Sequence, residues 1–108
     1  MARKKLETLT EQMYYVLLAL AQGPRHGYEI MQVVSLITAG RVTIGAGTLY
    51  ALLGRFEEEG YISLSGTQER RKYYALSPSG RAALREEYVR LRRQVADGEK
   101  ILREGDSL

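Results

Sequence analysis

The sequence has no cysteine and only one histidine among its 108 residues. Without cysteine the chain has no disulfide, no thiolate metal site and no cysteine nucleophile. No apolar run is long enough to span a bilayer, and we find no signal peptide, so we expect a cytoplasmic protein that does not bind a membrane.

Residues that could support catalysis are also scarce. His26, the single histidine, has no companion base, orienting group or second ligand, so we interpret it as a cap or a surface group at a helix start. Gly45 and Gly47 do not follow a hydrophobic strand, and Tyr50 stands where a nucleotide-binding loop has its third glycine. With no paired carboxylates or metal-ligand spacing either, we expect no enzyme, no cofactor and no metal site.

What the chain does contain is typical of one globular domain, with 44% hydrophobic and 27% charged residues. The net charge of +3 and a pI near 9.3 favour an anionic partner. The basic residues form two clusters, Arg3, Lys4 and Lys5 at the N-terminus and Arg70, Arg71 and Lys72 further on.

The stretch from Thr43 to Tyr61 is predicted to contain a helix. One face of this helix packs against the core, and the other face is presented at the surface. Helical spacing gathers an apolar face of Leu49, Leu52, Leu53 and Phe56. The opposite face is small and polar, with Gly47, Thr48, Ala51, Gly54 and Arg55. Gly60 is placed to end the helix with a left-handed cap, and Tyr61 to fold back onto its last turn.

Two alternatives stay open on the presented face. Gly54 costs about 1 kcal/mol in a helix interior, so it indicates close approach to another surface, either a partner molecule or a neighbouring helix. Arg55 contacts a partner or pairs with Glu59 four residues on. Because three consecutive glutamates from Glu57 would repel DNA, the N-terminal half of the helix is the part expected to face it.

Two helices are predicted to precede this stretch. Thr8 and Glu11 form a candidate capping box for the first helix, which Gly23 and Pro24 end. The second helix begins near His26 and Gly27, and its apolar face is Ile30, Val33, Val34 and Ile37.

A β-hairpin is predicted after the presented helix. The segment from Ile62 to Ser65 alternates as a half-buried strand, and Tyr74 and Leu76 alternate again beyond a tip between Gly66 and Arg71. The tip either enters a DNA groove with its basic residues or is a solvated loop.

The final segment is predicted to be one long helix, which Ser77 and Pro78 start. Apolar and small residues recur at alternating steps of four and three, at Leu84, Tyr88, Leu91, Val95, Gly98 and Leu102. An unbroken helix would extend about 40 Å, beyond the body of the domain, which predicts a homodimer. The seam could instead pack partly within its own subunit, and Gly98 could bend it. We therefore divide the chain into residues 1–77 and a dimerisation helix of residues 78–108.

This order of elements is that of a winged helix-turn-helix, mainly α with a small β-hairpin and a long terminal helix. Four motifs then closely resemble the PadR family of transcriptional regulators: HGYEI (residues 26–30), GTLYALL (47–53), EEEGYI (57–62) and RRKYYALSPSGR (70–81). The match extends from Leu9 to Arg81, and the single terminal helix is similar to the family's short subgroup.

The resemblance implies a dimeric repressor that binds a palindromic operator in double-stranded DNA and releases it on binding a small-molecule effector. It implies that Thr48 and Tyr50 contact phosphates, that the N-terminal end of their helix reads bases, and that the hairpin lies along the adjacent groove. The chain departs from the family in having Ala51 where proline is usual and Gly54 where a larger polar residue is common. It also lacks the tryptophans that hold flat aromatic drugs in some members, and Tyr88 is the ring available in their place.

Together, the residue pattern and the resemblance predict DNA contacts at Thr43, Gly47, Thr48, Tyr50, Ala51, Arg55, Arg70, Arg71 and Lys72. A second hypothesis is a winged helix that binds a protein through the same small-residue face, and it predicts no salt-dependent affinity for duplex DNA.

Overall fold

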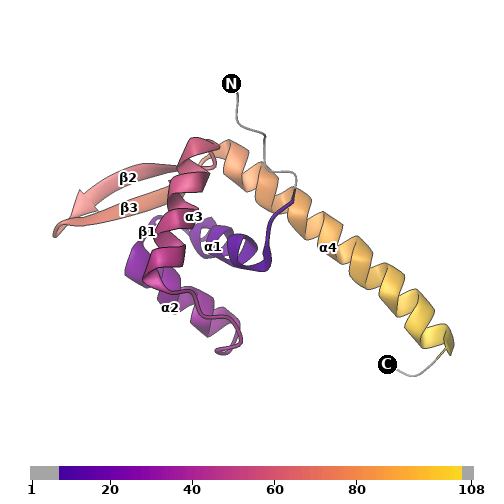
Figure 1. Cartoon of the computed structure of the whole chain (residues 1–108). Helices are drawn as coiled ribbons and strands as arrows, with labels where there is room; N and C mark the ends of the chain where they lie inside the picture. Colours follow the sequence, from indigo (N-terminus) through magenta and orange to yellow (C-terminus); the bar gives the residue numbers. More distant parts are fainter. Residues whose placement is uncertain (1–7, 106–108) are drawn as a thin grey trace.

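A computed structural model describes residues 8–105 of the chain, so the basic cluster at positions 3–5 lies outside the described residues. The fold is mainly helical with a small antiparallel sheet, as the sequence predicted (Figure 1). In chain order its elements are α1 (Glu11–Ala21), β1 (Arg25–His26), α2 (Gly27–Ile37), α3 (Ala46–Glu58), β2 (Ile62–Gln68), β3 (Arg71–Leu76) and α4 (Pro78–Gly105).

The core lies among the first three helices and receives side chains from the sheet and the start of α4. Its fully buried residues include Val16, Leu17, Leu20, Ile30, Val34, Leu49, Leu53 and Phe56. The predicted apolar face of α3 is confirmed, with Leu52 half-buried at its edge. The face of α2 ends earlier than predicted, because Ile37 is 51% exposed. Burying the inner face of α3 leaves its other face to solvent.

Local signals explain most helix ends. Tyr61 donates its backbone N–H to Phe56 at 2.9 Å, Gly60 (φ 77°) donates to Glu57, and the Tyr61 and Phe56 rings pack 6.3 Å apart. This confirms the predicted left-handed end of α3. The predicted start of α1 was wrong. Thr10, directly before the first helical residue, accepts a hydrogen bond from the N–H of Met13 at 3.2 Å, so Thr10 is the cap in place of Thr8.

The sheet has the order β1-β3-β2, and β2 and β3 form the wing. Its strands run further than predicted, so the tip is reduced to Glu69 and Arg70, both with positive φ (49° and 67°). Leu64, expected to be half-buried, is 50% exposed because the hairpin extends away from the helical body beyond Ile62 (Figure 1). The short β1, which the sequence did not predict, joins the wing to the start of α2.

The terminal helix is continuous through Gly98, which settles the question that the sequence left open at this residue. It begins as predicted, with the Ser77 hydroxyl accepting from the N–H of Gly80 at 3.0 Å. At 28 residues α4 is about 42 Å long. Its first turns pack against α1 and β3, and the rest projects from the body (Figure 1). Over residues 8–105, no helix combines the length and the apolar character needed to cross a membrane.

Candidate nucleic-acid interface

The N-terminal half of α3 presents an open, small-residue surface. Gly47, Thr48, Tyr50, Ala51 and Gly54 are all exposed. A Cβ built on Gly47 or Gly54 meets no atom within 4 Å. Within the described residues Gly54 therefore does not pack against a neighbouring helix, which removes that alternative. The outer face of α3 is free to lie close to another molecule.

Tyr50 is held at this surface by its contact with α2. A Cβ added to Gly27, the first residue of α2, would lie 2.6 Å from the Tyr50 hydroxyl oxygen and 3.0 Å from the ring carbon that bears it. The tyrosine ring thus occupies space that only glycine leaves free at position 27. Two of the sequence motifs, HGYEI and GTLYALL, meet at this contact, which places the Tyr50 hydroxyl beside the start of α2.

The wing completes a groove next to α3, which we call the wing groove. It has a volume of about 390 Å³ and is lined by His26, Gly27, Tyr28, Tyr50, Arg70, Arg71, Lys72 and Tyr74. Its polar groups are tyrosine hydroxyls and the cationic ends of the wing side chains, which suit phosphate oxygens. The fold therefore brings together four of the predicted contact residues from two distant segments, Tyr50 with Arg70, Arg71 and Lys72.

The remaining predicted contacts lie elsewhere. Thr43 is exposed in the loop before α3, and Arg55 lies near the C-terminal end of that helix. Arg55 pairs with Glu59 at 3.3 Å, so the local ion pair left open by the sequence is present. Glu57 adds an exposed carboxylate at this end. The cations of the wing groove and the acids of α3 thus occupy separate places, as the charge pattern predicted.

His26 contributes to the groove in a way that sequence analysis missed. Its ring caps α2 by accepting from the N–H of Glu29 at 3.3 Å, while the Glu29 carboxylate accepts from the His26 N–H at 3.1 Å. The cap itself confirms the sequence prediction. The ring also lies 3.1 Å from Arg71 on the wing and edge-on to Tyr73 at 5.1 Å. Because His26 and Arg71 are 45 positions apart in the sequence, no local pattern indicated this contact.

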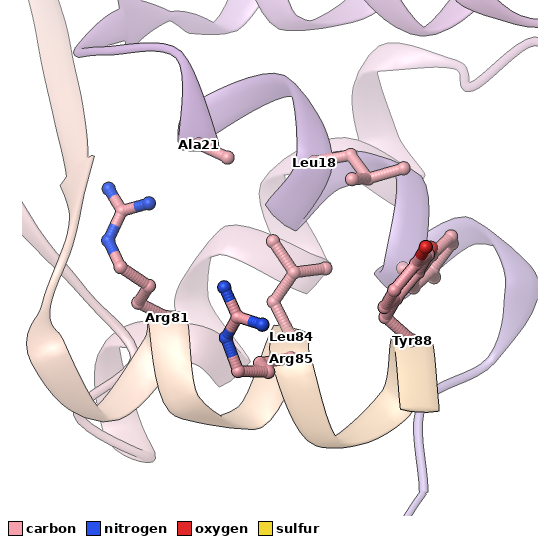
Figure 2. Close-up of a pocket in the computed structure, with 7 residues that line it drawn as sticks. Leu18, Ala21, Arg81, Leu84, Arg85 and Tyr88 are labelled. Carbon is pink, nitrogen blue, oxygen red and sulfur yellow. The ribbon is translucent and has the colours of Figure 1, made fainter. Parts of the chain in front are cut away.

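A second cavity, of about 260 Å³, lies between α1 and α4. Figure 2 shows Arg81, Leu84, Arg85 and Tyr88 following one another along α4, with Ala21 and Leu18 of α1 opposite. Tyr14 also lines this cavity, and burial together with the nearby Tyr15 raises the pKa of its hydroxyl. The lining is mainly apolar, with two guanidinium groups on one side.

A buried carboxylate ties the start of α1 to α4. Glu87, 4% exposed, accepts from the backbone N–H of Leu9 at 3.3 Å and forms an ion pair with Arg90. Hydrogen bonding from Arg90 lowers the pKa of the Glu87 carboxyl, and burial opposes this only in part. The bond to Leu9 links α4 to the segment before α1, and the ion pair with Arg90 lies within α4.

The seam predicted for a dimer divides into two parts. Leu84 is 7% exposed and packs in the core of its own subunit, and Leu91 is half-buried. Tyr88, Val95 and Leu102 are 46%, 62% and 51% exposed. The start of the seam, at Leu84, therefore packs within its own subunit, which is the alternative that the sequence left open. In the projecting part of α4, no other segment of the described chain covers the seam.

Comparison with known proteins agrees with this geometry. Residues 16–86 match the transcriptional regulator PadR-like family. A transcriptional regulator from Clostridium thermocellum is 26% identical with a TM-score of 0.69, over 85% of this chain and 89% of its own. A PadR-like transcription factor from Bacteroides fragilis is also 26% identical with a TM-score of 0.70, over 83% and 88% of the two chains.

A sequence relative comes from transposon Tn4556 of Streptomyces fradiae, an uncharacterised 37.1 kDa protein. The two are 36% identical over 72 residues, which are 67% of this chain and 20% of that protein. The chain thus spans about a fifth of the length of this relative. The matched residues 16–86 contain α2, α3 and the whole wing. The chain belongs to the PadR-like family of transcriptional regulators, which is not a class of enzymes.

Proposed function

We propose that this protein is a repressor that binds a palindromic operator as a homodimer and releases it when a small molecule binds. The observation that carries the proposal is the junction of the small, open face of α3 with the cationic wing groove. A recognition helix needs a surface that approaches base edges closely, flanked by groups that bind phosphates.

Each predicted contact has a role in this proposal. Gly47 and Ala51 let the α3 backbone approach the major groove, with Thr43 at its entrance. Thr48 and Tyr50 bind phosphates by their hydroxyl groups. The wing lies along the neighbouring backbone with Arg70, Arg71 and Lys72. Arg55 is the weakest member of the set, because its pair with Glu59 has to open before it reaches DNA.

The dimer is proposed from the projecting half of α4. Tyr88, Val95 and Leu102 expose an apolar stripe that the subunit's own body does not cover. Contact with a second copy would bury this stripe and set the separation of the two α3 helices. Binding to successive major grooves needs a separation of about 34–36 Å. Leu84 and Leu91 support the stripe from within the subunit.

The cavity between α1 and α4 is the proposed effector site. A ligand there would contact Leu18 of α1 and Tyr88 of α4 at once, so its binding would change the angle at which α4 leaves the body. Because α4 sets the spacing in the proposed dimer, a small change of angle would move one half of the dimer out of register with its half-site.

The test is fluorescence anisotropy with the DNA upstream of this protein's own gene, a shuffled duplex as control, and two salt concentrations. We expect tight binding to the native duplex that weakens with salt, over a weak background on the control. Equal weak binding to both duplexes would reject this duplex as the operator. No binding to either duplex at low salt would favour the protein-binding alternative.

A further inference from the structure

We propose that His26 is a positioning residue shared between the wing and α2. Its ring accepts a hydrogen bond either from Arg71 of the wing or from the first turn of α2. When DNA binds, Arg71 leaves the ring for a phosphate, and the ring caps α2. The inference rests on the proposed DNA-binding function, and it concerns the regulation of the same groove.

Two hydrogen-bond donors face the two nitrogens of this ring. The backbone N–H of Glu29 lies 3.3 Å from Nδ1, and Nη1 of Arg71 lies 3.1 Å from Nε2. A neutral imidazole has one nitrogen that accepts and one that carries a proton. Either tautomer therefore leaves one of these donors without its bond, and a protonated ring accepts neither.

The surroundings give each tautomer a distinct role. With the proton on Nδ1, Nε2 accepts from Arg71 and holds the wing, but the cap of α2 is lost. With the proton on Nε2, Nδ1 caps α2, and the N–H points to the side of the Glu29 carboxylate, whose oxygen lies 3.6 Å away. Arg71 then has no acceptor on the ring. Water can reach the exposed Arg71 side chain, whereas the ring, at 6% exposure, leaves little room for water to replace a missing partner of its own.

A phosphate removes the conflict. It offers Arg71 a charged acceptor, which makes a stronger hydrogen bond with guanidinium than neutral imidazole does. Once Arg71 turns to the phosphate, the ring caps α2 with Nδ1, so Arg71 and the Glu29 N–H both have an acceptor. Binding of DNA therefore does two things together. It gives the wing a contact with a phosphate, and it restores the cap at the N-terminus of α2, where Gly27 lies against Tyr50.

The tautomer of His26 is directly measurable, because the chain has a single histidine and its ring nitrogens need no assignment. We would record ¹⁵N ring spectra at about pH 8.5, above the usual range of imidazole titration. The samples are the full chain free and bound to the upstream duplex, with Arg71→Ala and Arg70→Ala as free proteins. Arg70→Ala removes the same charge from the neighbouring residue.

In the free wild-type protein we expect a substantial Nδ1–H population, retained in Arg70→Ala. Arg71→Ala and the DNA complex should both move the ring to the Nε2–H form. An identical tautomer in the free wild-type and Arg71→Ala proteins would overturn the inference. Because that comparison needs no DNA, failure of the wild-type protein to bind any duplex would count against the proposed function separately.

A stability cycle gives a second readout. In His26→Asn the shorter side chain still caps α2 through its amide oxygen, and Arg71 loses the ring nitrogen that accepts from it. We expect Arg71→Ala to lower the melting temperature of the wild-type protein by up to a few degrees, because it removes the bond between the wing and the ring, and to leave that of His26→Asn unchanged. Equal shifts in the two backgrounds would show that the two residues act independently and would overturn the inference.

Discussion

Replacing Arg71 with alanine should flatten the salt dependence of DNA binding. The wing supplies the cations Arg70, Arg71 and Lys72, and a dimer doubles them to about six phosphate contacts. Each contact contributes about −0.9 to the slope of log affinity against log salt, so the wild-type slope should be about −5.4 and that of the variant about −3.6. Between 50 and 200 mM salt, wild-type affinity should then fall about 1,800-fold and variant affinity about 150-fold.

The assay is anisotropy over a salt series with the same duplex for each protein. Arg103→Ala is the matched control, because it removes a cation from the projecting end of α4, where Arg103 lies 3.6 Å from Glu99 and is 69% exposed. The control should keep the wild-type slope, and Arg71→Ala should keep the wild-type preference among sequences, since phosphates carry no base identity. Equal slopes for Arg71→Ala and wild type would refute the wing contact.

Three further predictions concern other parts of the structure. Gly27→Ala should displace the Tyr50 ring and weaken DNA binding by about tenfold, while the free energy of unfolding changes by less than about 1 kcal/mol. Unchanged affinity would show that the Tyr50 ring does not contribute to DNA binding. Glu87→Gln should lower stability by about 1 kcal/mol at neutral pH, a melting shift of about 4–8 °C. Because Arg90 lowers the pKa of this carboxyl, its stabilisation is present above the unfolded-state pKa and is lost as pH falls through the folded value. Melting curves of both proteins should therefore converge in acid, and a constant difference would contradict this. Val95→Glu should give monomers by light scattering with wild-type helical content, because Val95 is 62% exposed in the single chain; a persistent dimer would exclude the α4 stripe.

Local signals in the sequence were sufficient for most of the fold. Gly60 ended α3, and Ser77 with Pro78 started α4, because caps depend on a few neighbouring residues. The start of α1 was misplaced because Thr8 and Thr10 are both competent caps, and the sequence alone does not distinguish them. The two-residue β1 has no periodicity, so pairing with β3 alone defines it.

Contacts between segments that are distant in the chain could not be predicted from the sequence. It contained Gly27 and Tyr50 in separate motifs but did not show that one makes room for the other. It placed a cap at His26, and only the folded wing brings Arg71 to the other side of that ring. In α4 the heptad spacing predicted one seam, whereas packing against α1 buries Leu84 and leaves Val95 exposed. Periodicity selects a face of a helix, but the length of the body it rests on decides which part is covered.

The account depends most on two copies of α3 occupying successive major grooves. Hydroxyl-radical footprinting of the bound duplex tests this directly. We expect two protected segments on one face of the DNA with centres about 10–10.5 base pairs apart, and loss of tight binding when five base pairs are inserted between them. One protected segment, or binding that tolerates the insertion, would contradict the proposed arrangement.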